Sequence, residues 1–265
     1  MQVTARANTS AAPDTSRQLH SLIEAPEGST LPDMDSDLRQ RMLAYYDERA
    51  PDYEQAYTLG TGTASIADPE VFKAEARVLV GIVGHSAHGR IMDLACGTAY
   101  WLPHYAPNCS MITLFDQSER MLTEARAKAI RLGLVNRCTF LLGDFLEHDF
   151  EQNAYDTALV GFFLSHLTED QERHLFDALR AMLDSSGRFL ILDSAWSPER
   201  SKFNAKVERQ SRRLNDGTTF EIYKRYCDRN DISRWARQYD VKLSIEHFGL
   251  GFYAVSGTFG WTSGS

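Results

Sequence analysis

The chain has 265 residues, of which 43% are hydrophobic and 24% charged, and its formal net charge is -8. This length and composition are typical of a globular protein with one or two cores, and they exclude a wholly disordered chain, a collagen and a coiled coil. The excess of acidic residues makes nucleic acid and anionic membranes unfavourable partners. No apolar run approaches the roughly 20 residues that a membrane helix needs. We therefore expect a soluble, cytoplasmic protein.

The four cysteines, Cys96, Cys109, Cys138 and Cys227, are widely spaced and form no C-x-x-C pair. Such pairs supply the ligands of many structural zinc sites, and disulfide frameworks belong mainly to small secreted domains. The sequence therefore predicts reduced thiols and no metal site.

The N-terminal third contains a polar segment followed by two helices. Residues 1–35 are rich in Ala, Ser, Thr and Pro without hydrophobic periodicity, which predicts a solvated tail, with a cleaved transit peptide as the alternative. The first helix is expected from Asp37 to the residue before Pro51, and the second over residues 70–83. The first helix carries large side chains at helical intervals, at Leu38, Met42, Tyr45 and Tyr46.

After Gly89 the chain alternates between apolar strands and amphipathic helices. Ser118 and Thr168 are expected to cap the starts of two helices, and Gly133 and Gly187 to mark their ends. Near-continuous apolar strands between helices indicate a parallel sheet covered on both faces. We therefore predict a doubly wound α/β core over residues 89–193. Its strands are expected at residues 91–95, 111–115, 138–142, 157–163 and 189–192.

The last part of the chain differs in charge. Residues 196–240 contain eleven basic and seven acidic residues, a local charge of +4 that leaves -12 for the rest. Because the acids are interspersed, we expect solvated helix faces here, with an anion-binding surface as the alternative. Residues 241–248 and 252–258 alternate in polarity and predict a terminal antiparallel strand pair.

Polar residues follow three of the predicted strands at their carboxyl ends, where open parallel sheets bind ligands. A dinucleotide would require G-x-G-x-x-G after the first strand, but only Gly97 is present. Asp116 ends the second strand at the spacing suited to binding ribose hydroxyls, and Asp144 and Phe145 offer an acceptor and an aromatic face to a purine. Each residue alone is more typical of a turn or cap, whereas their combination predicts a nucleoside site.

Four motifs together resemble those of class I S-adenosylmethionine-dependent methyltransferases across residues 41–194. They are DLACGTA (93–99), DQSERML (116–122), GDF (143–145) and FFLSHL (162–167). The resemblance implies a Rossmann-like, mostly parallel seven-stranded sheet in a methyltransferase domain of residues 36–265. Within it we expect lid helices at 36–88, a cofactor-binding core at 89–193, a substrate-side insert at 194–240 and terminal strands at 241–265.

The resemblance also implies which residues bind S-adenosylmethionine. Asp93 would anchor the first turn, Asp116 would bind the ribose, and Asp144 would accept from the adenine amino group. The other expected cofactor contacts are Tyr53, Ala95, Gly97, Gln117, Met121, Phe145 and Phe162. Ala95 and Ala99 replace glycines of the family pattern. Their methyl groups are tolerable if φ is negative, and they motivate a non-catalytic cofactor-binding scaffold as an alternative.

His166 is the best candidate for a general base, because neutral imidazole can accept a proton near pH 7; a structural histidine is the alternative. Asp193, at the end of the fifth strand, is the second candidate base, with helix capping as its alternative role. Trp101, Trp196 and Tyr223 are candidates for an acceptor pocket, although large aromatics are more often core.

These patterns predict transfer of a methyl group from S-adenosylmethionine to a small-molecule acceptor, with O- or N-methylation favoured and secondary metabolism as one setting. The alternatives are a nicotinamide-dependent oxidoreductase, which the missing glycines disfavour, and a module that docks a macromolecule through the +4 segment. The oligomeric state is left open.

Overall fold

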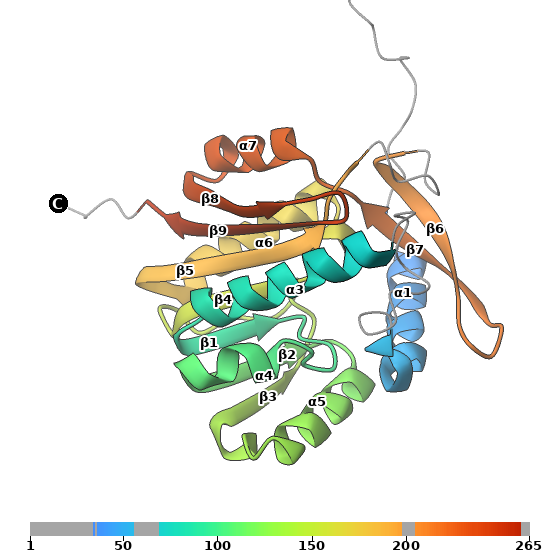
Figure 1. The fold of residues 1–265 in the computed structure, drawn as a ribbon, viewed down its shortest axis with the longest axis horizontal. Coiled ribbons are helices and arrows are strands. Elements are labelled where there is room, and N and C mark those ends of the chain that lie inside the picture. Colours follow the sequence, from blue (N-terminus) through green and yellow to red (C-terminus); the bar gives the residue numbers. More distant parts are fainter. Residues whose placement is uncertain (1–33, 35, 56–68, 198–204, 261–265) are drawn as a thin grey trace, which may run out of the picture. The chain divides into compact units, whose positions relative to one another are not determined.

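A mostly parallel sheet forms the centre of the fold (Figure 1). The computed structural model describes residues 34, 36–55, 69–197 and 205–260, all within the compact unit Pro32–Ser265. Nearly all of the predicted tail therefore lies outside the described residues. The strands of this sheet are β1 (Gly89–Leu94), β2 (Cys109–Asp116), β3 (Cys138–Leu142), β4 (Tyr155–Gly161), β5 (Leu183–Ser194), β8 (Val241–Phe248) and β9 (Phe252–Phe259).

The strand order, β3-β2-β1-β4-β5-β9-β8, confirms the predicted seven-stranded sheet. Strands β1 to β5 pair in parallel, whereas β9 pairs antiparallel with β5 and β8 antiparallel with β9. Because β1 to β5 run parallel, their carboxyl ends lie on one side of the sheet, and ligands bind there in such sheets, at the switch in strand order between β1 and β4.

Helices cover both faces of the sheet. On one face lie α3 (Pro69–Ser86), α4 (Leu102–Tyr105) and α5 (Glu119–Arg131), and on the other α6 (Glu169–Met182) and α7 (Arg229–Gln238). Side chains of a strand alternate between faces, so Ile91 packs in the α3–α5 cluster and its neighbour Met92 in the α6–α7 cluster. Single-turn helices η2 (Ala106–Asn108) and η3 (Val135–Arg137) lead into β2 and β3.

The helix starts agree with the capping residues that the sequence contains. The Ser118 side chain accepts from the backbone N–H of Met121, and Thr168 forms a capping box with Gln171. The predicted end of α6 at Gly187 is wrong, because the helix ends at Met182. Leu183 already pairs with Tyr155 of β4, so sheet pairing extends β5 through the glycine.

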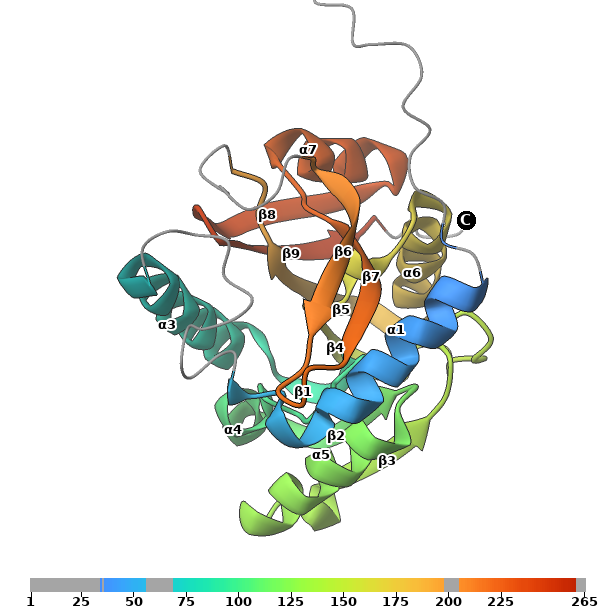
Figure 2. The same cartoon turned by 90° about the vertical axis from the view of Figure 1, so that its right-hand side faces the viewer.

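A smaller unit stands at the carboxyl edge of the sheet (Figure 2). It contains α1 (Ser36–Arg49), the single turn η1 (Ala50–Asp52), and a hairpin of β6 (Val207–Arg213) and β7 (Thr219–Arg225). Leu38, Met42 and Tyr45 of α1 pack against Ile222 and Tyr223 of β7 in a separate apolar cluster. The first predicted helix is therefore present, and it packs against a hairpin far along the chain.

The +4 segment forms this hairpin as well as helix α7, so the expectation of helix faces alone is wrong. Several of its basic side chains are neutralised internally: Lys206 pairs with Asp228 at 2.9 Å, Arg225 with Glu172, and Arg234 with Glu172 at 3.0 Å. Asp228 is already counted in the +4, so the excess of positive charge is offset in part by one acid outside the segment, Glu172 of α6.

Candidate active site

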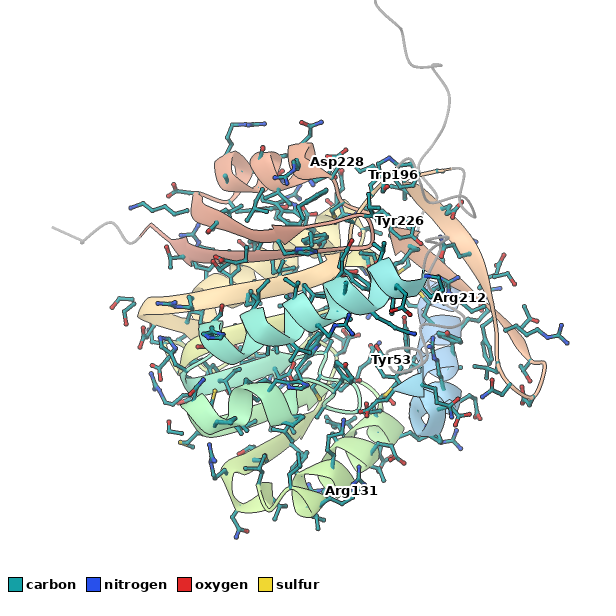
Figure 3. All side chains as sticks on the ribbon, in the orientation of Figure 1. Tyr53, Arg131, Trp196, Arg212, Tyr226 and Asp228 are labelled. Carbon is teal, nitrogen blue, oxygen red and sulfur yellow. The ribbon has the colours of Figure 1, made fainter. Side chains whose placement is uncertain are left out.

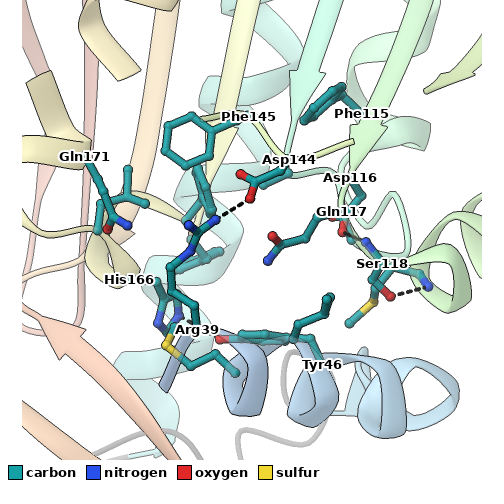
Figure 4. A pocket seen from close by; sticks show the side chains of 18 of the residues that line it. Arg39, Tyr46, Phe115, Asp116, Gln117, Ser118, Asp144, Phe145, His166 and Gln171 are labelled. Carbon is teal, nitrogen blue, oxygen red and sulfur yellow. Dashed lines mark hydrogen bonds and ion pairs between the residues drawn. The ribbon is translucent and has the colours of Figure 1, made fainter. Parts of the chain in front are cut away.

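A cavity of about 320 Å³ lies between the carboxyl ends of the strands and α1 (Figure 4). We call its two sides the sheet wall, formed by Ala95, Gly97, Asp116 and Asp144, and the lid wall, formed by Arg39, Tyr46 and His166. Nine of the ten residues predicted to bind the cofactor line the cavity: Tyr53, Ala95, Gly97, Asp116, Gln117, Met121, Asp144, Phe145 and Phe162. Their individual roles stay predictions.

The turn after β1 has an unusual backbone. Ala95, Gly97 and Ala99 all have positive φ, at 56°, 55° and 55°. The condition under which the two alanines would be tolerated, a negative φ, is therefore not met. A non-glycine residue in this region costs roughly 1–2 kcal/mol, so both alanines occupy positions where glycine would be less strained.

Asp116 joins the ends of β1 and β2. One of its carboxylate oxygens accepts from the Gly97 backbone N–H at 2.8 Å, and the other accepts from the Ser118 N–H at 2.9 Å. Burial raises the pKa of Asp116 to about 6, while these backbone hydrogen bonds oppose the rise. The carboxylate is thus held in a fixed orientation at the cavity wall.

Arg39 is a cavity residue that the sequence analysis missed. Its guanidinium donates to the Asp144 carboxylate across the cavity, and the same carboxylate accepts from the Leu146 N–H at 3.0 Å (Figure 4). Arg39 lies one and two turns before Leu43 and Tyr46, which also line the cavity. This i, i+4, i+7 spacing was the signal that could have assigned Arg39 to the same helix face.

His166 lies in the single-turn helix η4 (Leu164–His166) after β4 and lines the cavity. Its Nε2 is 2.7 Å from the Tyr46 hydroxyl, and its Nδ1 is 2.9 Å from the Tyr223 backbone oxygen. Burial, followed by the positive charge of Lys224, lowers the pKa of His166 to about 3. The ring is therefore neutral near pH 7.

Asp193, the second candidate base, is fully buried and does not line the cavity. Its carboxylate accepts from the backbone N–H groups of Ser165 and Ser194, at 2.8 and 2.6 Å. Lys224 lies 3.6 Å from the same carboxylate and donates to the Ser165 hydroxyl at 2.5 Å. These contacts attach η4, and with it His166, to β5 and β7.

The three aromatic residues predicted for an acceptor pocket lie outside the cavity lining. Trp101 is buried and stacks on Phe162, with 6.1 Å between ring centroids. Tyr223 is buried between α1 and β7, although its backbone oxygen contacts His166. Trp196 lies beside Tyr226, 6.0 Å between centroids (Figure 3). The structure thus places all three in packing contacts.

Asp93 also lies outside the lining. Its carboxylate is buried and accepts from the Tyr105 hydroxyl at 2.9 Å. Burial raises the pKa of Asp93 to about 7, and this hydrogen bond opposes the rise. The contact attaches β1 to α4 beneath the cavity.

None of the helices among the described residues is long and apolar enough to cross a membrane. No group of three or more His, Cys, Asp or Glu side chains in this part of the chain is placed to hold a metal ion.

Comparison with known proteins agrees with this architecture. The sequence profile of the family described as "Methyltransferase domain" matches residues 91–187. A DhpI–SAH complex superposes with a TM-score of 0.68 at 21% identity, covering 86% of this chain and 99% of that one. The glycopeptide N-methyltransferase MtfA superposes with a TM-score of 0.54 at 14% identity, covering 71% and 86%, when bound to sinefungin. At these identities the likeness concerns the fold.

Two curated relatives are similar in sequence. The ubiquinone/menaquinone biosynthesis C-methyltransferase UbiE of Cereibacter sphaeroides is 27% identical over 126 residues, 43% of this chain and 49% of that protein. The carboxy-S-adenosyl-L-methionine synthase of Wolinella succinogenes is 28% identical over 183 residues, covering 66% and 73%. The chain thus spans about half the length of the UbiE relative.

The strand order and the cavity at the carboxyl edge define a class I methyltransferase fold. With the family match, which makes residues 91–187 a methyltransferase domain, they agree with the predicted class of S-adenosylmethionine-dependent methyltransferases.

Proposed function

We propose that this protein transfers the methyl group of S-adenosylmethionine to an oxygen or nitrogen atom of a small-molecule acceptor. The observation that carries the proposal is the meeting of Gly97, Asp116 and Asp144 around one cavity, in the order that the motifs imply for the methionine, ribose and adenine parts. A cavity of about 320 Å³ is within the range of small-molecule sites.

The residues present suit this cofactor. Each Asp116 oxygen retains a lone pair after accepting one backbone N–H, so the carboxylate can also accept from ribose hydroxyls. A Cβ built on Gly97 would lie in van der Waals contact with Tyr53, 3.6 Å away, and with Met121, 3.9 Å away, so the bare backbone leaves room between these side chains and the turn. Tyr53, the nearest side chain to that point, would cover the methionine end.

When bound, S-adenosylmethionine supplies an electrophilic methyl group on a positively charged sulfur. The protein would chiefly position the acceptor, exclude water beneath α1 and remove one proton where the acceptor needs it. His166 is the proposed base, because it lines the cavity in its neutral form. Asp193 is proposed as a positioning residue that holds η4 through the Ser165 N–H.

A small acceptor is favoured over a macromolecule by the internal pairing of the +4 segment. Arg225 and Arg234 both pair with Glu172, an acid outside this segment, which leaves less positive charge for docking RNA or an acidic protein. A cytoplasmic location, which the four unpaired cysteines favour, belongs to the same proposal.

Calorimetry and a turnover assay test the proposal together. We expect S-adenosylhomocysteine to bind and reduced nicotinamide dinucleotide not to bind; the reverse result would refute the cofactor assignment. Formation of S-adenosylhomocysteine is then measured with small phenols, alcohols and amines, and with the O- or N-methylated form of each as a matched control. Activity confined to carbon acceptors or to RNA would contradict the proposed acceptor class, and binding without turnover would indicate the non-catalytic scaffold.

A further inference from the structure

Tyr46, His166 and the backbone of Tyr223 form a chain of hydrogen bonds that begins at the cavity. The Tyr46 hydroxyl is 2.7 Å from His166 Nε2, and His166 Nδ1 is 2.9 Å from the Tyr223 carbonyl oxygen. A carbonyl oxygen can only accept, so Nδ1 carries the hydrogen of the neutral ring. Nε2 is then the acceptor, and the Tyr46 O–H donates to it. The lone pairs of the Tyr46 oxygen therefore remain available on the cavity side.

The charged groups around His166 act in both directions, and burial has the largest effect on its protonation state. Lys224 of β7 and Arg212 of β6 disfavour a protonated His166, Asp193 of β5 favours it, and burial outweighs all three. Burial and the neighbouring phenols Tyr53 and Tyr45 raise the pKa of Tyr46 well above its ordinary value, although Arg49 and Arg212 act in the opposite direction. At neutral pH the pair is a neutral phenol that donates to a neutral imidazole.

We propose that Tyr46 is a catalytic residue that contacts the acceptor and relays its proton to His166, so that the site selects acceptors bearing an O–H or N–H group. This inference rests on the proposed function. It adds Tyr46 to the catalytic residues and an O–H or N–H group to the requirements for the acceptor. Tyr46 is suited to this contact because it lines the cavity from α1, opposite Asp116 and Asp144 (Figure 4).

The relay balances in atoms and charge. The acceptor oxygen or nitrogen forms a bond to the methyl carbon while the bond from that carbon to sulfur breaks and its electron pair returns to sulfur. The acceptor proton moves to the Tyr46 oxygen as the Tyr46 proton moves to His166 Nε2. One positive charge disappears at sulfur and one appears on the imidazole, so the buried site keeps its net charge. Because the net charge of the site does not change, even a weakly basic histidine can serve as the base: His166 is protonated as the positive charge on the nearby sulfur is lost.

Nitrogen NMR of the histidine rings, with S-adenosylhomocysteine bound, tests the arrangement without any acceptor. The His166 signals are assigned by their loss in His166→Gln. We expect a protonated Nδ1 and an unprotonated Nε2 at pH 7, with Tyr46→Phe shifting Nε2 more than Nδ1. Tyr45→Phe is the matched control, since Tyr45 is buried in the α1–β7 cluster outside the cavity lining. A protonated Nε2, or an Nε2 signal insensitive to Tyr46→Phe, would overturn the relay.

Kinetics with an acceptor found in the turnover assay test the chemical step. Tyr46→Phe should lower kcat by about 10²-fold, the usual contribution of a positioned acid or base, with S-adenosylhomocysteine affinity changed less than about twofold. The loss should shrink at pH values above the pKa of the acceptor, because an ionised acceptor has no proton to relay; a merely structural role would give a loss independent of pH. Tyr45→Phe should leave kcat unchanged.

The failures can be told apart. Wild-type turnover with full-rate Tyr46→Phe overturns the relay alone. Wild-type protein that binds S-adenosylhomocysteine but methylates none of the acceptors overturns the proposed function and the relay with it.

Discussion

The two walls of the cavity are held in different ways. In the sheet wall, Asp116 accepts hydrogen bonds from the backbone N–H groups of Gly97 and Ser118. These residues lie in the turns after β1 and β2, which the parallel pairing of the two strands already brings together. The side chains of the lid wall are held by contacts with distant parts of the chain: Arg39 contacts Asp144 of the sheet wall, 105 positions away, and Tyr46 contacts His166, 120 positions away. The sheet wall thus follows from the common fold, whereas the lid wall depends on the packing particular to this chain and is the side suited to acceptor selection.

Breaking the support of the lid wall should have the largest effect. Glu172 of α6 is fully buried and pairs with Arg225 of β7, so Glu172→Ala leaves a buried guanidinium without its carboxylate. We expect a loss of about 3–5 kcal/mol in the free energy of unfolding, measured by urea denaturation. Asp170→Ala is the control on the same helix, because its ion pair with Arg173 is exposed and should contribute less than about 1 kcal/mol. Equal effects of the two variants would refute this account.

Within the sheet wall, Asp116→Asn should weaken S-adenosylhomocysteine binding about 10- to 100-fold, because hydrogen bonds to a charged acceptor contribute about 1.5–3 kcal/mol. Calorimetry at pH 8 measures the change.

The pKa of Asp116, about 6, also predicts a pH dependence. Affinity of the wild type should fall as pH drops through about 6 and the carboxylate is protonated, and this fall should be absent in Asp116→Asn. Unchanged affinity in the variant would remove Asp116 from the ribose role.

Where the walls meet, Arg39 and the adenine amino group should compete for Asp144. Arg39→Ala frees the carboxylate, and we expect S-adenosylhomocysteine to bind about 3- to 10-fold more tightly, which corresponds to roughly 1 kcal/mol for this partly exposed ion pair. Arg41→Ala, which removes a cation from α1 outside the cavity lining, should have no effect. Weaker binding in Arg39→Ala would show instead that Arg39 contacts the cofactor directly.

The smallest effect is expected at Ala95. Glycine relieves the strain of φ 56° but adds freedom to the unfolded chain, so Ala95→Gly should raise the free energy of unfolding by about 0.5 kcal/mol. Thermal and urea unfolding measure it. Gly97→Ala is the matched control, because it introduces a side chain at a residue with nearly the same positive φ. This variant should lower the free energy of unfolding. Destabilisation by Ala95→Gly would mean that the methyl contact matters more than the backbone strain.

Residue patterns were enough to predict the sheet and the residues of the sheet wall. Apolar runs located β1 to β5 because a strand buried on both faces must be continuously apolar, and the strand-end motifs located Asp116 and Asp144 because parallel strands end at one edge. The capping residues Ser118 and Thr168 predicted two helix starts from purely local hydrogen bonding.

The assembly of the lid wall depends on tertiary packing, because His166 alone of its three residues was a site candidate in the sequence. Nothing local in the polar, charge-rich segment 205–225 indicated a hairpin, because β6 and β7 pair apart from the main sheet and bury side chains chiefly against α1. The same packing brought Tyr46 to His166 and Arg39 to Asp144, and it placed Tyr223 in the interior, whereas Trp101 is buried in the cluster between the sheet and α3–α5. Contacts between residues more than 100 positions apart leave no periodicity or motif in the chain, so their identity became visible only once the sheet had fixed where α1 and the hairpin lie.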